Sequence, residues 1–214
     1  SIRLLRIPLS VNKAVLRPHC ALEPPMLANQ HTAALIAEMD KASPAEHWLE
    51  KLHDGTHVLI RPLSTHDHLG LLHFFQRLSP LSLRFRFLGA VTHVDASAID
   101  TLLSESAQIS RGYLALIHHD GELQVIGVSR YRRATDQDEQ CDCAVAVADP
   151  WLRKGLGRLL LGHLIDAARR EGFHKMCSTD LSTDYPIHGL YKQSGFTSAY
   201  LGRDFDRIVH ELEL

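Results

Sequence analysis

The chain has 214 residues, of which 45% are hydrophobic and 22% are charged, a composition typical of a soluble globular protein with one sizeable core. Its 23 lysine and arginine residues are offset by 25 acidic residues, so the net charge of −2 provides no basic field to attract nucleic acid or an anionic membrane. The sequence contains no run of about 18 apolar residues that could span a bilayer. We therefore expect a cytoplasmic protein that binds neither nucleic acid nor a membrane.

Histidine and cysteine spacing does not predict a metal site. The 15 histidines are scattered and lack known zinc-ligand spacing, and His118 and His119 beside a D-G turn are expected to face solvent. Cys141 and Cys143 are two residues apart without a second pair, so we interpret them as buried thiols. Four cysteines in a chain of this length indicate a reducing compartment rather than a disulfide scaffold.

Residues 1–50 differ in character from the rest of the chain. Prolines interrupt every pattern there except in 26–41, MLANQHTAALIAEMDK, which has helical character. The opening SIRLLRIPLSVNK breaks its apolar run and does not match a targeting segment. We therefore predict a partly helical N-terminal extension over 1–50 and one main domain over 51–214.

Regular patterns begin at residue 57. HVLIRPL, residues 57–63, is rich in branched residues and predicts a short strand. Apolar spacing then predicts three helices, over 69–78, 80–88 and 95–106.

The second half of the domain alternates strands and helices. GYLALIHHDGELQVIGVSRYRR, residues 112–133, has two apolar runs around a D-G turn and predicts a hairpin. CDCAVAVAD, residues 141–149, predicts the next strand. The remaining predicted elements are a helix over 156–171, a strand over 175–181, a helix over 185–194 and strands over 196–202 and 206–213. Hairpins combined with one strand-helix-strand unit predict an α/β fold with a mixed sheet flanked by helices.

The turn before the helix at 156–171 has the composition of an anion site. Gly155 and Gly157 stand where a helix has free backbone N–H groups, and Arg153, Lys154 and Arg158 add positive charge. The turn matches neither the dinucleotide fingerprint nor the P-loop. Taken alone, it is equally typical of a tight turn with a solvated basic rim. The helix itself has a continuous apolar stripe: Leu156, Leu160, Leu161, Leu164, Ile165 and Ala168.

Two longer stretches carry a family resemblance. VAVADPWLRKGLGRLLLGHLIDAARREGF, residues 145–173, together with LYKQSGF, residues 190–196, resembles the GNAT superfamily of acyl-CoA-dependent N-acetyltransferases. DGTHVLIRPLSTHDHLGLLHFFQRLSPLSLRFRF, residues 54–87, resembles the bacterial protein-lysine acetyltransferase branch. The resemblance runs from about residue 54 to 214 and implies a GNAT-like, mostly antiparallel central sheet with acetyl-CoA as co-substrate and no metal.

The resemblance also implies which residues bind the co-substrate. The family loop Q/R-x-x-G-x-G/A holds the coenzyme A pyrophosphate through main-chain amides, and here it is the segment 152–157, followed by Arg158. Val145 and Val147 correspond to the strand that pairs with the pantetheine arm. Leu152 replaces the usual Gln or Arg, which weakens a main-chain site only modestly. Asp184 stands where the branch commonly has Asn, and either helix capping or a ligand contact explains it. The implied set is Val145, Val147, Arg153, Lys154, Gly155, Leu156, Gly157, Arg158 and Asp184.

Acetyl transfer to an amine has two protonic demands. The amine must lose a proton before it attacks, since a free lysine has a pKa of about 10.4. The departing sulfur, whose thiol has a pKa of about 8.5, leaves more easily when a nearby acid protonates it. Tyr191 in Y-x-x-x-G-F resembles the family's acid, although a core aromatic would show the same spacing. Asp142 resembles the branch's glutamate base; being one methylene shorter, it favours a bridging water.

The strand at 141–149 places Asp142 on a face of small residues. Period-two alternation gives it the company of alanines, while Cys141 and Cys143 lie on the bulkier face with Val145 and Val147. An exposed strand carboxylate remains the plain alternative for Asp142, and Glu139 is the reserve candidate for the base.

These residues predict direct acetyl transfer from acetyl-CoA to a primary amine, without an enzyme-bound acyl intermediate. The favoured acceptor is a protein lysine, through the resemblance of the early segment alone. A small amine acceptor, a non-catalytic acyl-CoA-binding module and a coenzyme-free interaction protein remain as alternatives. The sequence does not fix the acceptor, the acyl length or the oligomeric state.

Overall fold

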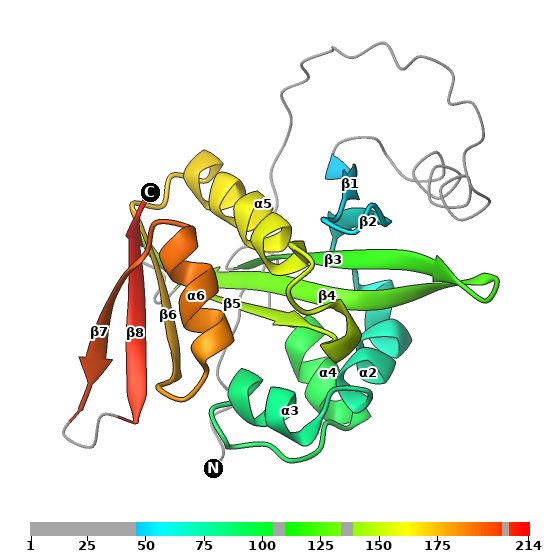
Figure 1. Cartoon of the computed structure of the whole chain (residues 1–214), viewed down its shortest axis with the longest axis horizontal. Coiled ribbons are helices and arrows are strands. Elements are labelled where there is room, and N and C mark those ends of the chain that lie inside the picture. Colours follow the sequence, from blue (N-terminus) through cyan, green and yellow to red (C-terminus); the bar gives the residue numbers. More distant parts are fainter. Residues whose placement is uncertain (1–45, 105–109, 134–138, 203–205) are drawn as a thin grey trace, which may run out of the picture.

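A computed structural model describes residues 46–104, 110–133, 139–202 and 206–214 (Figure 1). An eight-stranded sheet forms its centre, in the spatial order β1-β2-β3-β4-β5-β6-β8-β7. The strands are β1 Trp48–Lys51, β2 His57–Pro62, β3 Ser110–His119, β4 Glu122–Arg133, β5 Gln140–Val147, β6 Lys175–Leu181, β7 Thr197–Leu201 and β8 Arg207–Glu213. The α-helices are α2 His68–Gln76, α3 Pro80–Arg86, α4 Ala96–Ser104, α5 Leu156–Arg170 and α6 Tyr185–Gln193.

The sheet is mixed, as the alternation of hairpins and one strand-helix-strand unit predicts. β5 and β6 pair in parallel and are joined by helix α5, while every other pair of neighbouring strands is antiparallel. The predicted hairpin is formed by β3 and β4, and its turn residues Asp120 and Gly121 have φ of 50° and 86°. These values suit the tight turn that a D-G pair favours.

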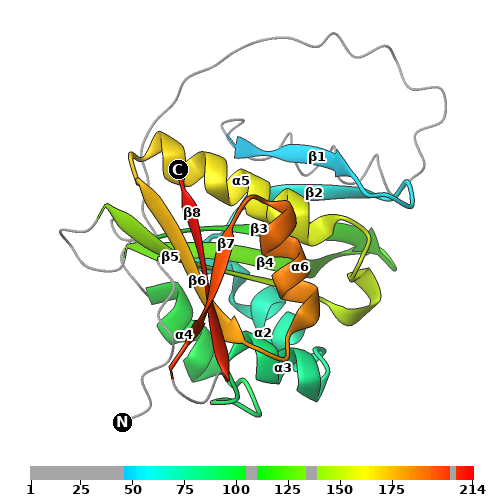
Figure 2. The ribbon, with the colours of Figure 1, turned by 60° about the vertical axis from the view of Figure 1, so that its left-hand side comes forward.

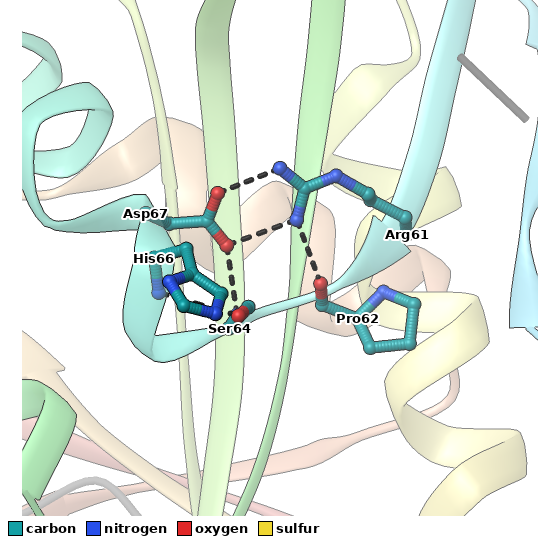
Figure 3. Close-up of polar contacts among 5 residues, drawn as sticks. All are labelled: Arg61, Pro62, Ser64, His66 and Asp67. Atoms are coloured by element: carbon teal, nitrogen blue, oxygen red, sulfur yellow. Dashed lines mark hydrogen bonds and ion pairs between the residues drawn. The ribbon is translucent and has the colours of Figure 1, made fainter. Parts of the chain in front are cut away.

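The connection from β2 to α2 is fixed by a group of polar contacts (Figure 3). The guanidinium of Arg61 donates hydrogen bonds to both carboxylate oxygens of Asp67, at N–O distances of 2.9 and 2.6 Å. The Asp67 carboxylate also accepts the backbone N–H of Ser64, whose hydroxyl caps the short helical turn Thr65–Asp67. A two-pronged ion pair of this kind is geometrically specific, so it sets the angle at which α2 leaves the sheet.

Each face of the sheet has its own core. Helix α5 covers one face, and α2, α3 and α4 lie on the other (Figure 1). All six residues of the predicted apolar stripe on α5 are buried. On β5, Cys141, Cys143 and Val145 belong to the core beneath α5, whereas Ala146 belongs to the opposite core. The predicted division of β5 into two faces is confirmed.

The sheet begins inside the segment 1–50 that the sequence assigns to an extension. Trp48 lies in β1, and its ring stacks on His163 of α5 with 4.1 Å between centroids. Glu50 contacts the same His163 at 2.9 Å. The sequence pattern missed β1 because its four residues are too few to establish an alternation. The predicted helix at 26–41 and Cys20 lie outside the described residues; Cys141, Cys143 and Cys177 are free thiols.

Candidate active site

The central cleft arises where β5 and β6 separate. The two strands pair only from Gln140–Asp142 against Lys175–Cys177, and no further pairs are formed along the described strands. Beyond that point a cavity of about 930 Å³ opens between them. Strand residues 142–147 and 178–180 line it, together with the turn after β5, the end of α3 and the start of α6. Figure 2 shows helix α6 beside the strands β6 and β7.

The glycine turn after β5 opens onto this cavity. Gly155 is the N-cap of α5 with φ of 91°, a conformation that favours glycine. Gly155, Gly157, Arg153 and Arg158 all line the cavity. Because the first N–H groups of a helix lack intrahelical partners, the turn presents donors and positive charge to an anion in the cavity.

Two members of the predicted set turn their side chains elsewhere. Lys154 forms an ion pair with Asp54 at 3.0 Å, and its ammonium lies 4.6 Å from the centre of the Trp151 ring. Leu156 is buried in the core beneath α5. Of these two, Leu156 can therefore contribute to an anion site only through its backbone, and Lys154 would first have to leave Asp54.

Strand β5 presents the predicted base and the two valines to the cavity. Asp142, Val145 and Val147 all line it. Asp142 is exposed and stands at the last parallel pair, opposite Cys177, where the strands begin to separate. The reserve candidate Glu139 does not line the cavity; its carboxylate contacts His174 at 2.6 Å.

Tyr191 lies one layer behind the cavity wall. Its side chain is fully buried, and its ring stacks on His210 with centroids 4.7 Å apart. Its hydroxyl lies 3.8 Å from the Cys143 thiol and interacts electrostatically with Ser178, and both of these neighbours line the cavity. Burial raises the pKa of Tyr191 well above its ordinary value, so the phenol stays protonated at neutral pH.

Asp184 caps helix α6 and also lines the cavity. Its carboxylate accepts the backbone N–H of Ile187 at 3.3 Å and so caps α6. The side chain is also buried at the cavity wall, and burial raises the pKa of this carboxyl. Capping therefore fixes the position of a carboxyl group that faces the cavity.

The structure adds polar residues that sequence reasoning did not select. Asp180 lines the cavity and accepts a hydrogen bond from the Ser178 hydroxyl at 2.7 Å. Burial raises the pKa of Asp180 to about 6. Arg86, at the end of α3, lines the same cavity from a segment distant in sequence. The polar alternation of Ser178 and Asp180 along β6 was a visible signal, whereas nothing in the sequence placed Arg86 opposite them.

Comparisons with known proteins agree with this geometry. The model of the acetyltransferase (GNAT) family matches residues 85–196. An acetyltransferase of Pseudomonas aeruginosa is 40% identical over 173 residues, which cover 81% of this chain and 92% of the relative. The GNAT domain of PAT from S. lividans superposes with a TM-score of 0.70 at 22% identity, covering 78% of this chain and 97% of that one. The ribosomal-protein-alanine N-acetyltransferase from Brucella melitensis gives 0.58 at 20% identity, covering 72% and 99%. These two structures share the fold.

Proposed function

Since this chain belongs to the acetyltransferase (GNAT) family and is an acetyl-CoA-dependent N-acetyltransferase, we propose that its acceptor is a protein lysine and that the cavity between β5 and β6 is where transfer occurs. The glycine turn supports the first part of the site. Its amide donors, with Arg153 and Arg158 beside them, suit the pyrophosphate of coenzyme A. The separated strands then leave main-chain groups of Val145 and Val147 for the pantetheine arm.

Asp142 is the proposed general base. It stands at the inner end of the opening between the strands, on the face of small residues that leaves space for an acceptor. Its exposure allows water to reach the carboxylate, which supports proton transfer from the ammonium group through a water molecule. The neutral amine then attacks the thioester carbonyl, the C–N bond forms as the C–S bond breaks, and the proton that the new amide nitrogen loses passes to the departing thiolate.

Tyr191 is the proposed partner of the departing thiolate, acting through Ser178. The Tyr191 hydroxyl is too deeply buried to contact a ligand in the cavity directly, but it interacts electrostatically with Ser178, which lines the wall. A phenol with a raised pKa is a weak acid, so we infer that this pair stabilises the thiolate by hydrogen bonding until a proton arrives.

A polypeptide acceptor is supported by the rim of the cavity. Leu81, Leu152 and Tyr185 line the cavity and are 56%, 41% and 76% exposed. They come from α3, the glycine turn and α6, so large apolar side chains surround the opening. Exposed apolar groups gathered at a site favour contact with a protein surface, whereas a small amine needs none of them.

Acceptor competition tests the proposal. We expect lysine peptides to release thiol from acetyl-CoA faster than polyamines or aminoglycosides at equal concentration. Replacing Leu81 and Tyr185 by Ser should raise KM for peptides and leave KM for acetyl-CoA unchanged. Leu69→Ser is the control, because Leu69 is 65% exposed on α2 and does not line the cavity. Turnover of small amines alone would contradict the protein-lysine acceptor.

A further inference from the structure

Helix α3 is held firmly at the end that faces the glycine turn. Asp149, in the turn that follows β5, accepts the backbone N–H of Ser79 at 3.0 Å and the hydroxyls of Ser79 and Ser82 at 2.8 Å. The pKa of Asp149 is lowered, because these hydrogen bonds outweigh its partial burial. The seven residues of α3 extend about 10 Å from this anchor. The anchor therefore fixes where the last residue, Arg86, enters the cavity.

Arg86 has a charge without an anionic partner. Its Nε is buried and has no hydrogen-bond partner, and no ion pair of its guanidinium occurs within the part of the chain that the structure describes. Burial lowers the pKa of Arg86 to about 10, which leaves the group protonated at neutral pH. Arg86 is half-buried, and a cation that is partly removed from water without a paired anion is costly, so proteins ordinarily satisfy it with a carboxylate or phosphate.

Carboxyl groups line the same cavity but do not neutralise Arg86 directly. Asp180 interacts with Arg86 electrostatically without an ion pair within 4.0 Å, and its carboxylate accepts the Ser178 hydroxyl. Asp184 caps α6. The same cavity is thus lined by Arg86 from α3 and by two carboxyl residues near the start of α6.

We propose that Arg86 binds a carboxylate carried by the acceptor, next to the amine that is acetylated, while Asp180 and Asp184 attract its ammonium group. This inference rests on the part of the proposed function that places acetyl transfer in this cavity, since it names the acceptor chemistry there. The carboxylate has two sources with one chemistry: an acidic residue beside a protein lysine, or the α-carboxylate of a free amino acid. The guanidinium fork suits either, because it donates two parallel hydrogen bonds.

The co-substrate does not account for Arg86. The pyrophosphate has its own donors in the glycine turn, where Arg153 and Arg158 line the cavity. That turn directly follows Asp149, which anchors the opposite end of α3 from Arg86. Arg86 therefore serves the acceptor side of the cavity.

Matched acceptors test the inference. The probes are free lysine against lysinamide, and peptides with Asp against Asn beside the lysine, each assayed by thiol release and by calorimetry on coenzyme A-saturated protein. We expect native protein to prefer the carboxylated member of at least one pair by about 10- to 100-fold, the strength of a hydrogen bond to a charged group. The pair that shows the preference identifies the source.

Variants assign the preference to Arg86. Arg86→Gln should remove most of the preference, and Arg86→Lys, which keeps the charge without the fork, should retain part of it. Arg84→Gln is the control, because Arg84 is exposed on the same helix and does not line the cavity. Acetyl-CoA affinity and the melting temperature of each variant show that it is folded.

Three results would overturn the inference. Native protein could treat both members of each pair alike, Arg86→Gln could slow both members equally, or no carboxylated probe could bind or react. Failure of native protein to bind acetyl-CoA, or turnover of free lysine without turnover of any lysine peptide, would instead contradict the proposed function, so the two failures are distinguishable.

Discussion

Several side chains at the cavity wall are polar groups held away from water. Ser178 donates a hydrogen bond to the Asp180 carboxyl and interacts electrostatically with the Tyr191 phenol, and burial raises the pKa of both titratable partners. Such a row of interacting polar groups is costly to leave incomplete, so each member affects its neighbours. Substitutions within the row should therefore change both the rate of transfer and the response of stability to pH.

Removing the Tyr191 hydroxyl should slow transfer without unfolding the protein. Tyr191→Phe keeps the ring that packs on His210, so we expect kcat to fall by about 10²-fold or more. Ser178→Ala should cause a similar loss, and the double variant should lose little more, because the two residues act as one unit. Stopped-flow or steady-state thiol release measures this. Additive losses would contradict a shared path.

Asp180 should make stability depend on pH. Burial raises the pKa of Asp180 from 3.8 to about 6. At pH values between these two pKa values, the native state therefore holds a proton that the unfolded chain releases. The free energy of unfolding contributed by Asp180 therefore falls as pH rises through this window, by at most about 3 kcal/mol. Asp180→Asn should stabilise the protein at pH 7.5 and have little effect at pH 4, as urea denaturation would show. Equal effects at both pH values would argue against a buried carboxyl.

At the scale of elements, the fold from residue 57 onward was largely predictable. The predicted strand at 175–181 matches β6, and the predicted helix at 156–171 is one residue longer than α5. Both were predictable because the spacing of apolar residues reflects which side chains are buried. The sequence motif also located the glycine turn at the start of α5, and this turn lines the cavity. Arg86 was not predictable, because its role depends on α3 lying across the opening between β5 and β6, which no local pattern encodes.

The N-terminus of α5 provides a test at this scale. A Cβ on Gly155 would lie 2.8 Å from His53 Nε2, and although that exposed ring could move, φ of 91° would remain unfavourable for alanine. We expect Gly155→Ala to cost about 1–2 kcal/mol in stability and to weaken acetyl-CoA binding. Gly162→Ala is the control: its Cβ would meet nothing within 4 Å, and in mid-helix it should stabilise by about 0.5–1 kcal/mol. Thermal melts and calorimetry separate the two effects.

Across the whole molecule, the cavity divides the sheet. Along the strands that the structure describes, β5 and β6 share three parallel residue pairs, and α5 is the covalent link between β1–β5 and the strands β6, β8 and β7. A ligand that contacts both sides binds the native state alone and should therefore stabilise it. Acetyl-CoA at about 100 times its Kd should add about 2.7 kcal/mol to the free energy of unfolding. A melting temperature that does not change with acetyl-CoA would contradict binding across the cavity.

The most direct measurement is a calorimetric titration of acetyl-CoA into native protein and into Gly155→Trp, with dephosphorylated and thioester-free analogues beside it. We predict saturable one-to-one binding to native protein and its loss in Gly155→Trp, because the added Cβ would lie 2.8 Å from His53 Nε2 and the indole would have to displace this ring, which lines the cavity beside the turn. Equal affinity of the two folded proteins would show that acetyl-CoA binds somewhere other than the cavity between β5 and β6.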